Sequence, residues 1–147
     1  YKLKNSHKFL ERSIGEELLQ PTRIYVKPIL EILKKLDSIH GLAHITGGSF
    51  AKLSRLNNKI DYNLDNLPQH ENIFSLIQQA GKISHREMYS TFNMGIGFCI
   101  IVSKPGLDYV EKILEKNKVK YHQIGHITKG NGVVSVTREG RKYVLTD

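Results

Sequence analysis

The segment at residues 41–49, Gly-Leu-Ala-His-Ile-Thr-Gly-Gly-Ser, carries the residues whose types and spacing best suit chemistry. Residues 42–46 predict a strand whose alternation places His44 and Thr46 on one face. The glycines that follow let the backbone turn sharply and let a ligand approach its amides. A helix over 50–56 would add free N–H groups and a dipole, so the pattern predicts either a phosphate site or a simple turn. The candidate ligand-binding residues of this segment are His44, Thr46, Gly47, Gly48 and Ser49.

Two other segments hold further candidates. Phe-Asn-Met-Gly-Ile-Gly at 92–97 places two glycines beside an apolar run, which indicates close approach of the backbone to a neighbour. Asn93 in this segment could bind a ligand or cap a turn. Pro-Thr-Arg-Ile-Tyr-Val-Lys at 21–27 offers two possible anion ligands, although such spacing is more typical of solvated surface charges. The candidates from these segments are Asn93, Gly95, Arg23 and Lys27.

Motifs for metal binding and for redox chemistry are missing from the sequence. His40 and His44 are four residues apart, but in a strand that spacing separates them by about 13 Å, too far for one ion. With no cysteine pair or His-Glu-x-x-His run beside them, we expect no metal site. The single cysteine, Cys99, excludes an internal disulfide and lies in an apolar run. We therefore expect a buried thiol and a reducing, cytoplasmic location.

Composition narrows the class of protein. The 147 residues fit one domain, and 39% hydrophobic and 24% charged residues are ordinary for a globular chain. No apolar stretch approaches the roughly 18 residues of a membrane helix, so no membrane partner is expected. The net charge of +8 suits phosphorylated ligands or nucleic acid. Few aromatic residues lie among the dispersed basic ones, which argues against the alternative of a nucleic-acid-binding module.

The spacing of apolar residues predicts the helices and strands that would position these candidate residues. Apolar residues at helical spacing predict a helix that begins at Val26 or Lys27, with Pro28 in its first turn. The Asn and Asp content of residues 57–68 predicts a loop, with a short strand around 60–62 as the alternative. The apolar residues expected to be buried here are Leu18 and Leu19 before the helix, and Val26, Ile29, Leu30, Leu33 and Leu36 on its face.

The second half of the chain mixes helices and strands. A helix over 73–80 should stop at Gly81, and the capping-box pattern that starts at Ser84 predicts a short helix to about Thr91. The order of elements predicts an α/β (α+β) domain with a mixed β-sheet flanked by helices. The remaining predicted elements are a buried strand over 94–102, a helix from Pro105-Gly106, β-prone runs at 120–127, 133–137 and 142–145, and a hairpin turn at Glu139-Gly140.

Taken together, these segments resemble one family. The runs at 21–27, 41–48 and 91–97 are similar to hallmark segments of the carboxyl-terminal domain of phosphoribosylformylglycinamidine cyclo-ligases. Gly-Glu-Glu-Leu-Leu at 15–19 fits as well, and the similarity is close over residues 14–103. The alternatives within the superfamily are formylglycinamidine ribonucleotide synthetase, selenophosphate synthetase, thiamine-monophosphate kinase and a hydrogenase maturation factor.

The resemblance implies a two-domain, homodimeric enzyme of purine biosynthesis. Such an enzyme uses ATP and Mg²⁺ to convert formylglycinamidine ribonucleotide to aminoimidazole ribonucleotide by ring closure. An amino-terminal domain would carry the dimer interface and most of the site for ATP and Mg²⁺, and the active-site cleft would lie between the domains. Residues 1–147 would then form the carboxyl-terminal domain alone, with residues 1–13 leading into it, and the isolated domain would be inactive.

The resemblance also gives the candidate residues roles. Ser49 stands where the family usually has a third glycine. Because serine disfavours positive φ, we expect the turn to survive if only Gly47 and Gly48 need that geometry. Contacts to phosphate or substrate are implied first for His44, Thr46 and the amides of the 41–49 loop, then for Asn93 and Gly95, and last for Arg23.

Overall fold

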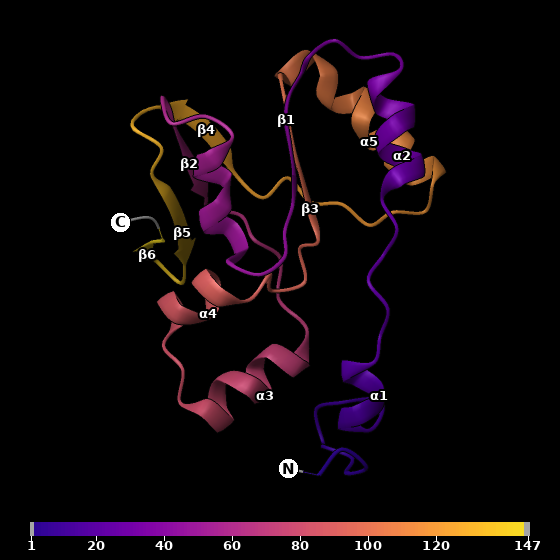
Figure 1. Cartoon of the computed structure of the whole chain (residues 1–147), viewed down its shortest axis with the longest axis vertical. Coiled ribbons are helices and arrows are strands. Elements are labelled where there is room, and N and C mark those ends of the chain that lie inside the picture. Colours follow the sequence, from indigo (N-terminus) through magenta and orange to yellow (C-terminus); the bar gives the residue numbers. More distant parts are fainter. Residues whose placement is uncertain (1, 146–147) are drawn as a thin grey trace.

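The computed structural model describes residues 2–145, which form helices and strands interspersed along the chain (Figure 1). Over this range, no helix combines the length and the apolar character needed to span a bilayer. The elements are α1 (Ile14–Leu18), α2 (Val26–Leu33), β1 (Ile39–His44), the 3₁₀ helix η1 (Ser49–Arg55), β2 (Ile60–Leu64), α3 (Asn72–Gly81), α4 (His85–Thr91), β3 (Phe98–Val102), the 3₁₀ turn η2 (Lys104–Gly106), α5 (Leu107–Lys116), β4 (His126–Lys129), β5 (Val134–Arg138) and β6 (Arg141–Val144).

The strands form two sheets. A four-stranded sheet has the order β4-β2-β5-β6, in which β2 and β5 are parallel and the other pairs are antiparallel. A two-stranded ribbon pairs β1 with β3 in antiparallel fashion, and its register sets His44 opposite Phe98 and Ala43 opposite Cys99. The predicted α/β fold with a mixed sheet and flanking helices is thus confirmed, with the ribbon as a second, separate sheet.

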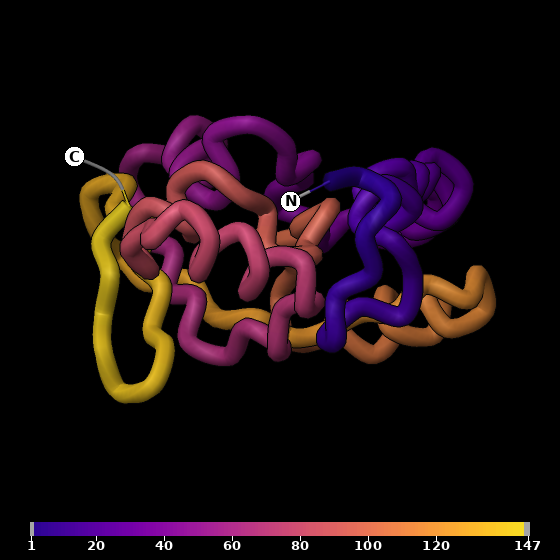
Figure 2. Tube along the Cα trace, turned by 90° about the horizontal axis from the view of Figure 1, so that it is seen from below, coloured from indigo at the N-terminus to yellow at the C-terminus, as the bar shows by residue number. Residues whose placement is uncertain are grey.

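The ribbon lies between two apolar clusters. On one side α2 and α5 pack together against it around Ile32 and Val110, as Figure 1 shows. On the other side a larger cluster joins the four-stranded sheet to η1 and α4. Figure 2 shows the yellow carboxyl-terminal hairpin at one end of the molecule and the α2–α5 pair at the other. The fully buried large side chains of the larger cluster are Tyr62, Phe50, Ile45, Met88, Val134 and Val136.

Helix α2 begins where the sequence predicts, at Val26 with Pro28 in the first turn. Its buried face is narrower than predicted, because Pro28, Ile29 and Ile32 are buried whereas Leu30 is 52% exposed. Val26 and Leu33 are exposed as well. The prediction that all the apolar residues of this helix face the core is therefore wrong.

The segment before α2 also differs from the prediction. Leu18 and Leu19, expected as anchors, are exposed, and Leu19 is 81% so. Ile14 anchors α1 instead, because it packs against Ile73 and Leu76 of α3. Ser13 and Glu16 close a capping box at the start of α1. Of the predicted lead-in segment, Tyr1 lies outside the described residues, and residues 2–12 contain no helix or strand.

Several predicted boundaries shift. The strand predicted at 42–46 is β1, which begins earlier, at Ile39, and ends at His44, two residues before the predicted end. The loop predicted at 57–68 contains β2, in agreement with the alternative prediction of a short strand around 60–62. The helix predicted over 50–56 is the 3₁₀ helix η1. The strand predicted over 94–102 begins only at Phe98 because a tight turn precedes it, and of the run at 120–127 only the last two residues are in a strand.

Candidate functional site

Two of the segments singled out in the sequence meet in a cluster of aromatic rings with Phe98, the residue that directly follows the third segment. Tyr25 comes from the 21–27 segment, His44 ends β1 and Phe98 begins β3. The ring centroids of Tyr25 and His44 are 6.0 Å apart, and those of Tyr25 and Phe98 are 5.3 Å apart. His44 stacks on Phe98 at 6.2 Å. The pairing of β1 with β3 therefore brings together residues that are more than fifty positions apart in the chain.

The turn after β1 presents exposed backbone. Thr46, Gly47 and Gly48 are exposed, and within the described residues the amides of both glycines lack a hydrogen-bond partner. Gly47 faces open space where a side chain would lie. Positive φ occurs at Gly48, at 80°, and at Ser49, at 42°. The condition that only Gly47 and Gly48 need positive φ is therefore not met, because Ser49 adopts this conformation itself while Gly47 does not.

Ser49 ties the two glycine-containing loops together. Its side chain is fully buried, and its hydroxyl donates to the Phe92 carbonyl at 2.6 Å. The Ser49 amide donates to the Thr46 carbonyl at 2.8 Å, and the Ile45 amide donates to the Gly97 carbonyl at 2.9 Å. Both polar hydrogens of Ser49 thus have partners inside the protein, which favours a supporting role over the direct ligand contact expected from the sequence.

The second loop is a tight turn around Asn93. The Gly95 amide donates to Asn93 Oδ1 at 3.2 Å, and the Ile96 amide donates to the Asn93 carbonyl at 2.9 Å. Met94 and Gly95 both have positive φ. Asn93 therefore caps this turn through one side-chain atom. Its Nδ2 has no hydrogen-bond partner within the described residues and is left as a donor for a ligand.

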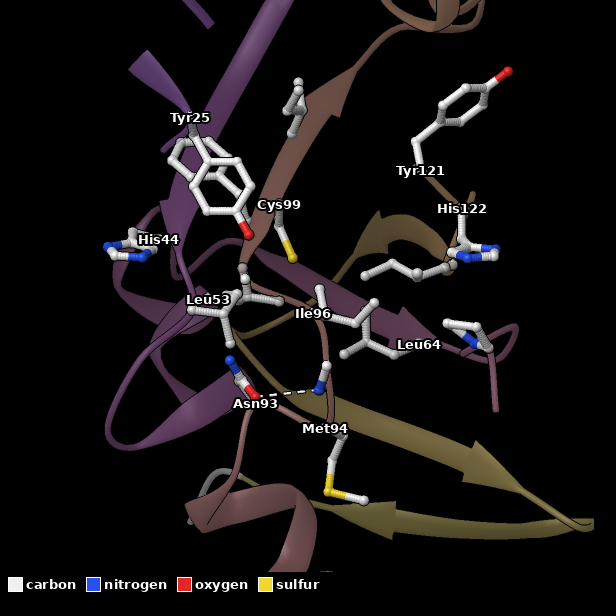
Figure 3. A pocket seen from close by; sticks show the side chains of 18 of the residues that line it. Tyr25, His44, Leu53, Leu64, Asn93, Met94, Ile96, Cys99, Tyr121 and His122 are labelled. Carbon is white, nitrogen blue, oxygen red and sulfur yellow. Dashed lines mark hydrogen bonds between the residues drawn. The ribbon is translucent and has the colours of Figure 1, made fainter. Parts of the chain in front are cut away.

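Both loops open on one groove, with a volume of about 1460 Å³. This volume exceeds that of a typical small-molecule site, so a nucleotide-sized ligand fits. Figure 3 shows Tyr25 and His44 on one side of the groove and Tyr121 and His122 on the other, with apolar side chains between. The predicted candidates that line the groove are Arg23, His44, Thr46, Gly47, Asn93 and Gly95, whereas Gly48 and Ser49 lie outside its lining.

Sequence reasoning missed Tyr25, Tyr121 and His122 as lining residues. Tyr25 lies two positions from Arg23 in a segment already singled out, so its place in that motif was a usable signal. Tyr121 and His122 follow α5 in a segment that was expected to form a strand, and no motif marked them. They lie in the segment that runs from α5 to β4, which Figure 1 shows crossing from one half of the molecule to the other.

Two titratable groups that line the groove, Cys99 and Tyr121, have raised pKa values. Burial raises the pKa of the Cys99 thiol to about 12. The pKa of Tyr121 is also raised to about 12, chiefly because its hydroxyl donates to the Glu115 carboxylate at 2.8 Å. Among residues 2–145, no group of three or more His, Cys, Asp or Glu side chains could hold a metal ion. The groove wall formed by this chain thus combines the neutral Cys99 thiol and Tyr121 hydroxyl with the basic side chains of Arg23, Lys104 and Lys120.

Comparisons with known proteins agree on one family. The model of the family described as AIR synthase related protein, C-terminal domain, matches residues 2–137. A phosphoribosylformylglycinamidine cyclo-ligase of Methanocaldococcus jannaschii is 45% identical over 144 residues, which cover 92% of this chain and 41% of that protein. The one of Methanococcus vannielii is 50% identical over 123 residues, which cover 84% of this chain and 35% of that protein.

A third relative shows the same pattern. The phosphoribosylformylglycinamidine cyclo-ligase of Caldicellulosiruptor bescii is 48% identical over 136 residues, which cover 90% of this chain and 40% of that protein. The chain thus spans about two fifths of the length of the curated relatives that it matches. Since the family match extends over nearly the whole chain, the chain belongs to the family of AIR synthase related carboxyl-terminal domains.

Proposed function

We propose that the chain forms one wall of the active site of a phosphoribosylformylglycinamidine cyclo-ligase. The observation that carries this proposal is the convergence of two loops, 46–49 and 92–97, on one groove. Both loops offer donors without partners in the described residues, namely the Gly47 amide and Asn93 Nδ2. The names of the relatives support the same activity.

In the proposed reaction, ATP transfers its γ-phosphoryl group to the formyl oxygen of formylglycinamidine ribonucleotide. The amidine-derived nitrogen then attacks the activated carbon, and phosphate leaves with that oxygen as aminoimidazole ribonucleotide forms. Such chemistry depends on fixed donors for phosphoryl charge and on accurate positioning of the reactants. The amide of Gly47 would meet phosphate or substrate oxygens, with His44 and Thr46 beside it, Asn93 Nδ2 across the loop junction and Arg23 at the rim.

The rest of the proposed enzyme would supply what this wall lacks. The described residues offer no cluster of acidic side chains for Mg²⁺, so their donor set does not fit a resident metal. ATP and Mg²⁺ would therefore bind mainly to an amino-terminal domain, which would also form a homodimer. Residues 1–147 would act as one domain of this cytoplasmic enzyme.

The test compares two glycine variants in the complete cyclo-ligase, one expected to affect activity and the other stability. Gly47→Val adds a side chain into open space at an ordinary φ, so we expect the melting temperature to stay within a few degrees of wild type. The same side chain blocks approach of a ligand to the turn, so kcat/KM should fall by about a hundredfold or more.

The matched control is Gly140→Val in the β5–β6 hairpin, which is also open to solvent but has a φ of 73°. Strain at this position should cost about 1–2 kcal/mol of stability and leave kcat/KM unchanged. A Gly47→Val enzyme with wild-type kcat/KM would contradict the proposed function.

A further inference from the structure

The Tyr25 ring is held in one place at the rim of the groove. Tyr25 precedes the first residue of α2 and is half-buried. Its ring contacts His44 edge-on at 6.0 Å and lies at 5.3 Å from Phe98, between centroids. It also packs against the apolar cluster of α2 and α5. These contacts leave the hydroxyl little freedom, and Figure 3 shows it pointing into the groove.

Gly97 makes the room that the Tyr25 hydroxyl occupies. A Cβ at position 97 would collide with this hydroxyl and would lie 2.9 Å from Tyr25 Cζ. Gly97 is not among the residues with positive φ, so its backbone does not require glycine. The absence of a side chain at position 97 thus leaves space for the Tyr25 hydroxyl.

The Tyr25 hydroxyl differs from the other tyrosine hydroxyls that lie around the groove. The Tyr62 hydroxyl donates to the Asn57 carbonyl, and the Tyr121 hydroxyl donates to the Glu115 carboxylate. Within residues 2–145, the Tyr25 hydroxyl has no hydrogen-bond partner, although its ring is fixed and half-buried. A phenol held in this way is expected to find a polar partner, because its O–H both donates and accepts.

We propose that Tyr25 is a ligand-binding residue of the groove, whose hydroxyl donates to an oxygen of the phosphorylated ribonucleotide substrate. This inference rests on the proposed function and adds a residue to that site. The hydroxyl and His44 would contact the same ligand because they share one aromatic cluster. Gly97 is then a positioning residue, which acts through Tyr25.

The experiment compares Tyr25→Phe, Gly97→Ala and the double variant in the complete enzyme. Tyr25→Phe removes one hydrogen bond to the ligand, so the KM for formylglycinamidine ribonucleotide should rise about tenfold. Its kcat should change less than about threefold and its melting temperature should not change, because the ring stays in place. Gly97→Ala should raise KM by a similar factor, and the double variant should fall short of the product of the two effects because both act through one hydroxyl.

Tyr109→Phe is the matched control. Tyr109 packs against the same cluster of α2 and α5 but does not line the groove. The KM of the Tyr109→Phe enzyme for formylglycinamidine ribonucleotide should therefore equal that of wild type. A wild-type KM for Tyr25→Phe would overturn the inference, as would a loss of thermal stability that accounts for the activity change. If Gly47→Val lowers kcat/KM while Tyr25→Phe is normal, only the role of Tyr25 fails. If both are normal, the proposed function fails with it.

Discussion

The half of the molecule built on the four-stranded sheet and the half built on the β1–β3 ribbon are packed to different degrees. In the sheet half, Tyr62, Val134 and Val136 are at most 1% exposed. In the ribbon half, α2 leaves Leu30 and Leu33 exposed, at 52% and 43%. The candidate site lies where the two halves meet, because its loops connect β1 to η1 and α4 to β3. The comparison indicates that the sheet half supplies most of the stability, while the junction and the ribbon present the ligand-binding groups.

The largest effect on stability should come from truncating a buried side chain in the sheet half. Phe50 is fully buried at the start of η1, so Phe50→Ala should lower the free energy of unfolding by about 3–5 kcal/mol. The free energy of unfolding is measured by urea titration, with circular dichroism as the signal. The ribbon-side counterpart, Leu30→Ala, should cost only about 0.5 kcal/mol because that side chain is half exposed. Equal costs for the two substitutions would remove the contrast between the halves.

An intermediate effect is expected at the junction. Ser49→Ala leaves the Phe92 carbonyl without its donor and keeps the strain of a positive φ, so stability should fall by about 1–3 kcal/mol. Ser49→Gly should cost less, because glycine relieves that strain. Hydrogen exchange at the amides of Gly95 and Ile96 should speed up in both variants.

Ser54→Ala is the control for this pair. Its hydroxyl also donates to a carbonyl, that of Ala51 at 2.8 Å, but the bond stays within η1. Exchange at Gly95 and Ile96 should therefore match wild type in Ser54→Ala. If the Ser49 variants exchange no faster than this control, the hydroxyl does not link the two loops.

The last prediction concerns the ribbon and needs no substitution. With a pKa of about 12, Cys99 remains a neutral thiol at pH 8, and only about one molecule in ten thousand carries the reactive thiolate. A disulfide reagent should therefore modify the folded protein at least about a hundredfold more slowly than the protein in urea. The rate should climb as pH rises towards 10. Rapid modification at pH 8 would show that β3 opens readily and that the ribbon is less ordered than the structure indicates.

Local signals were sufficient to predict several elements. Pro28 marks the first turn of α2, and Ser84 caps α4 by accepting from the Glu87 amide at 3.2 Å. Helix α3 ends at Gly81 as predicted, although the left-handed cap is the next residue, Lys82. Each of these effects acts within one turn of helix, so a single sequence contains the information. The buried face of α2 was harder to predict, because apolar spacing does not reveal which residues another element will cover.

The candidate site was predictable in its residues but less so in its geometry. The motifs around His44 and Asn93 were visible, and both do line one groove. The bond from Ser49 to Phe92 spans 43 residues, and the approach of Tyr25 to Gly97 depends on how the start of α2 packs against the ribbon. Such long-range contacts follow from tertiary packing, which no local pattern specifies.

The most direct test of the central claim is a crystal structure of the complete enzyme with formylglycinamidine ribonucleotide and a non-hydrolysable ATP analogue. We predict that a ligand oxygen lies within hydrogen-bond distance of the Gly47 amide and that Asn93 Nδ2 donates to the same ligand. A structure in which both ligands are bound while these two loops contact only solvent would contradict the claim that this chain forms one wall of the active site.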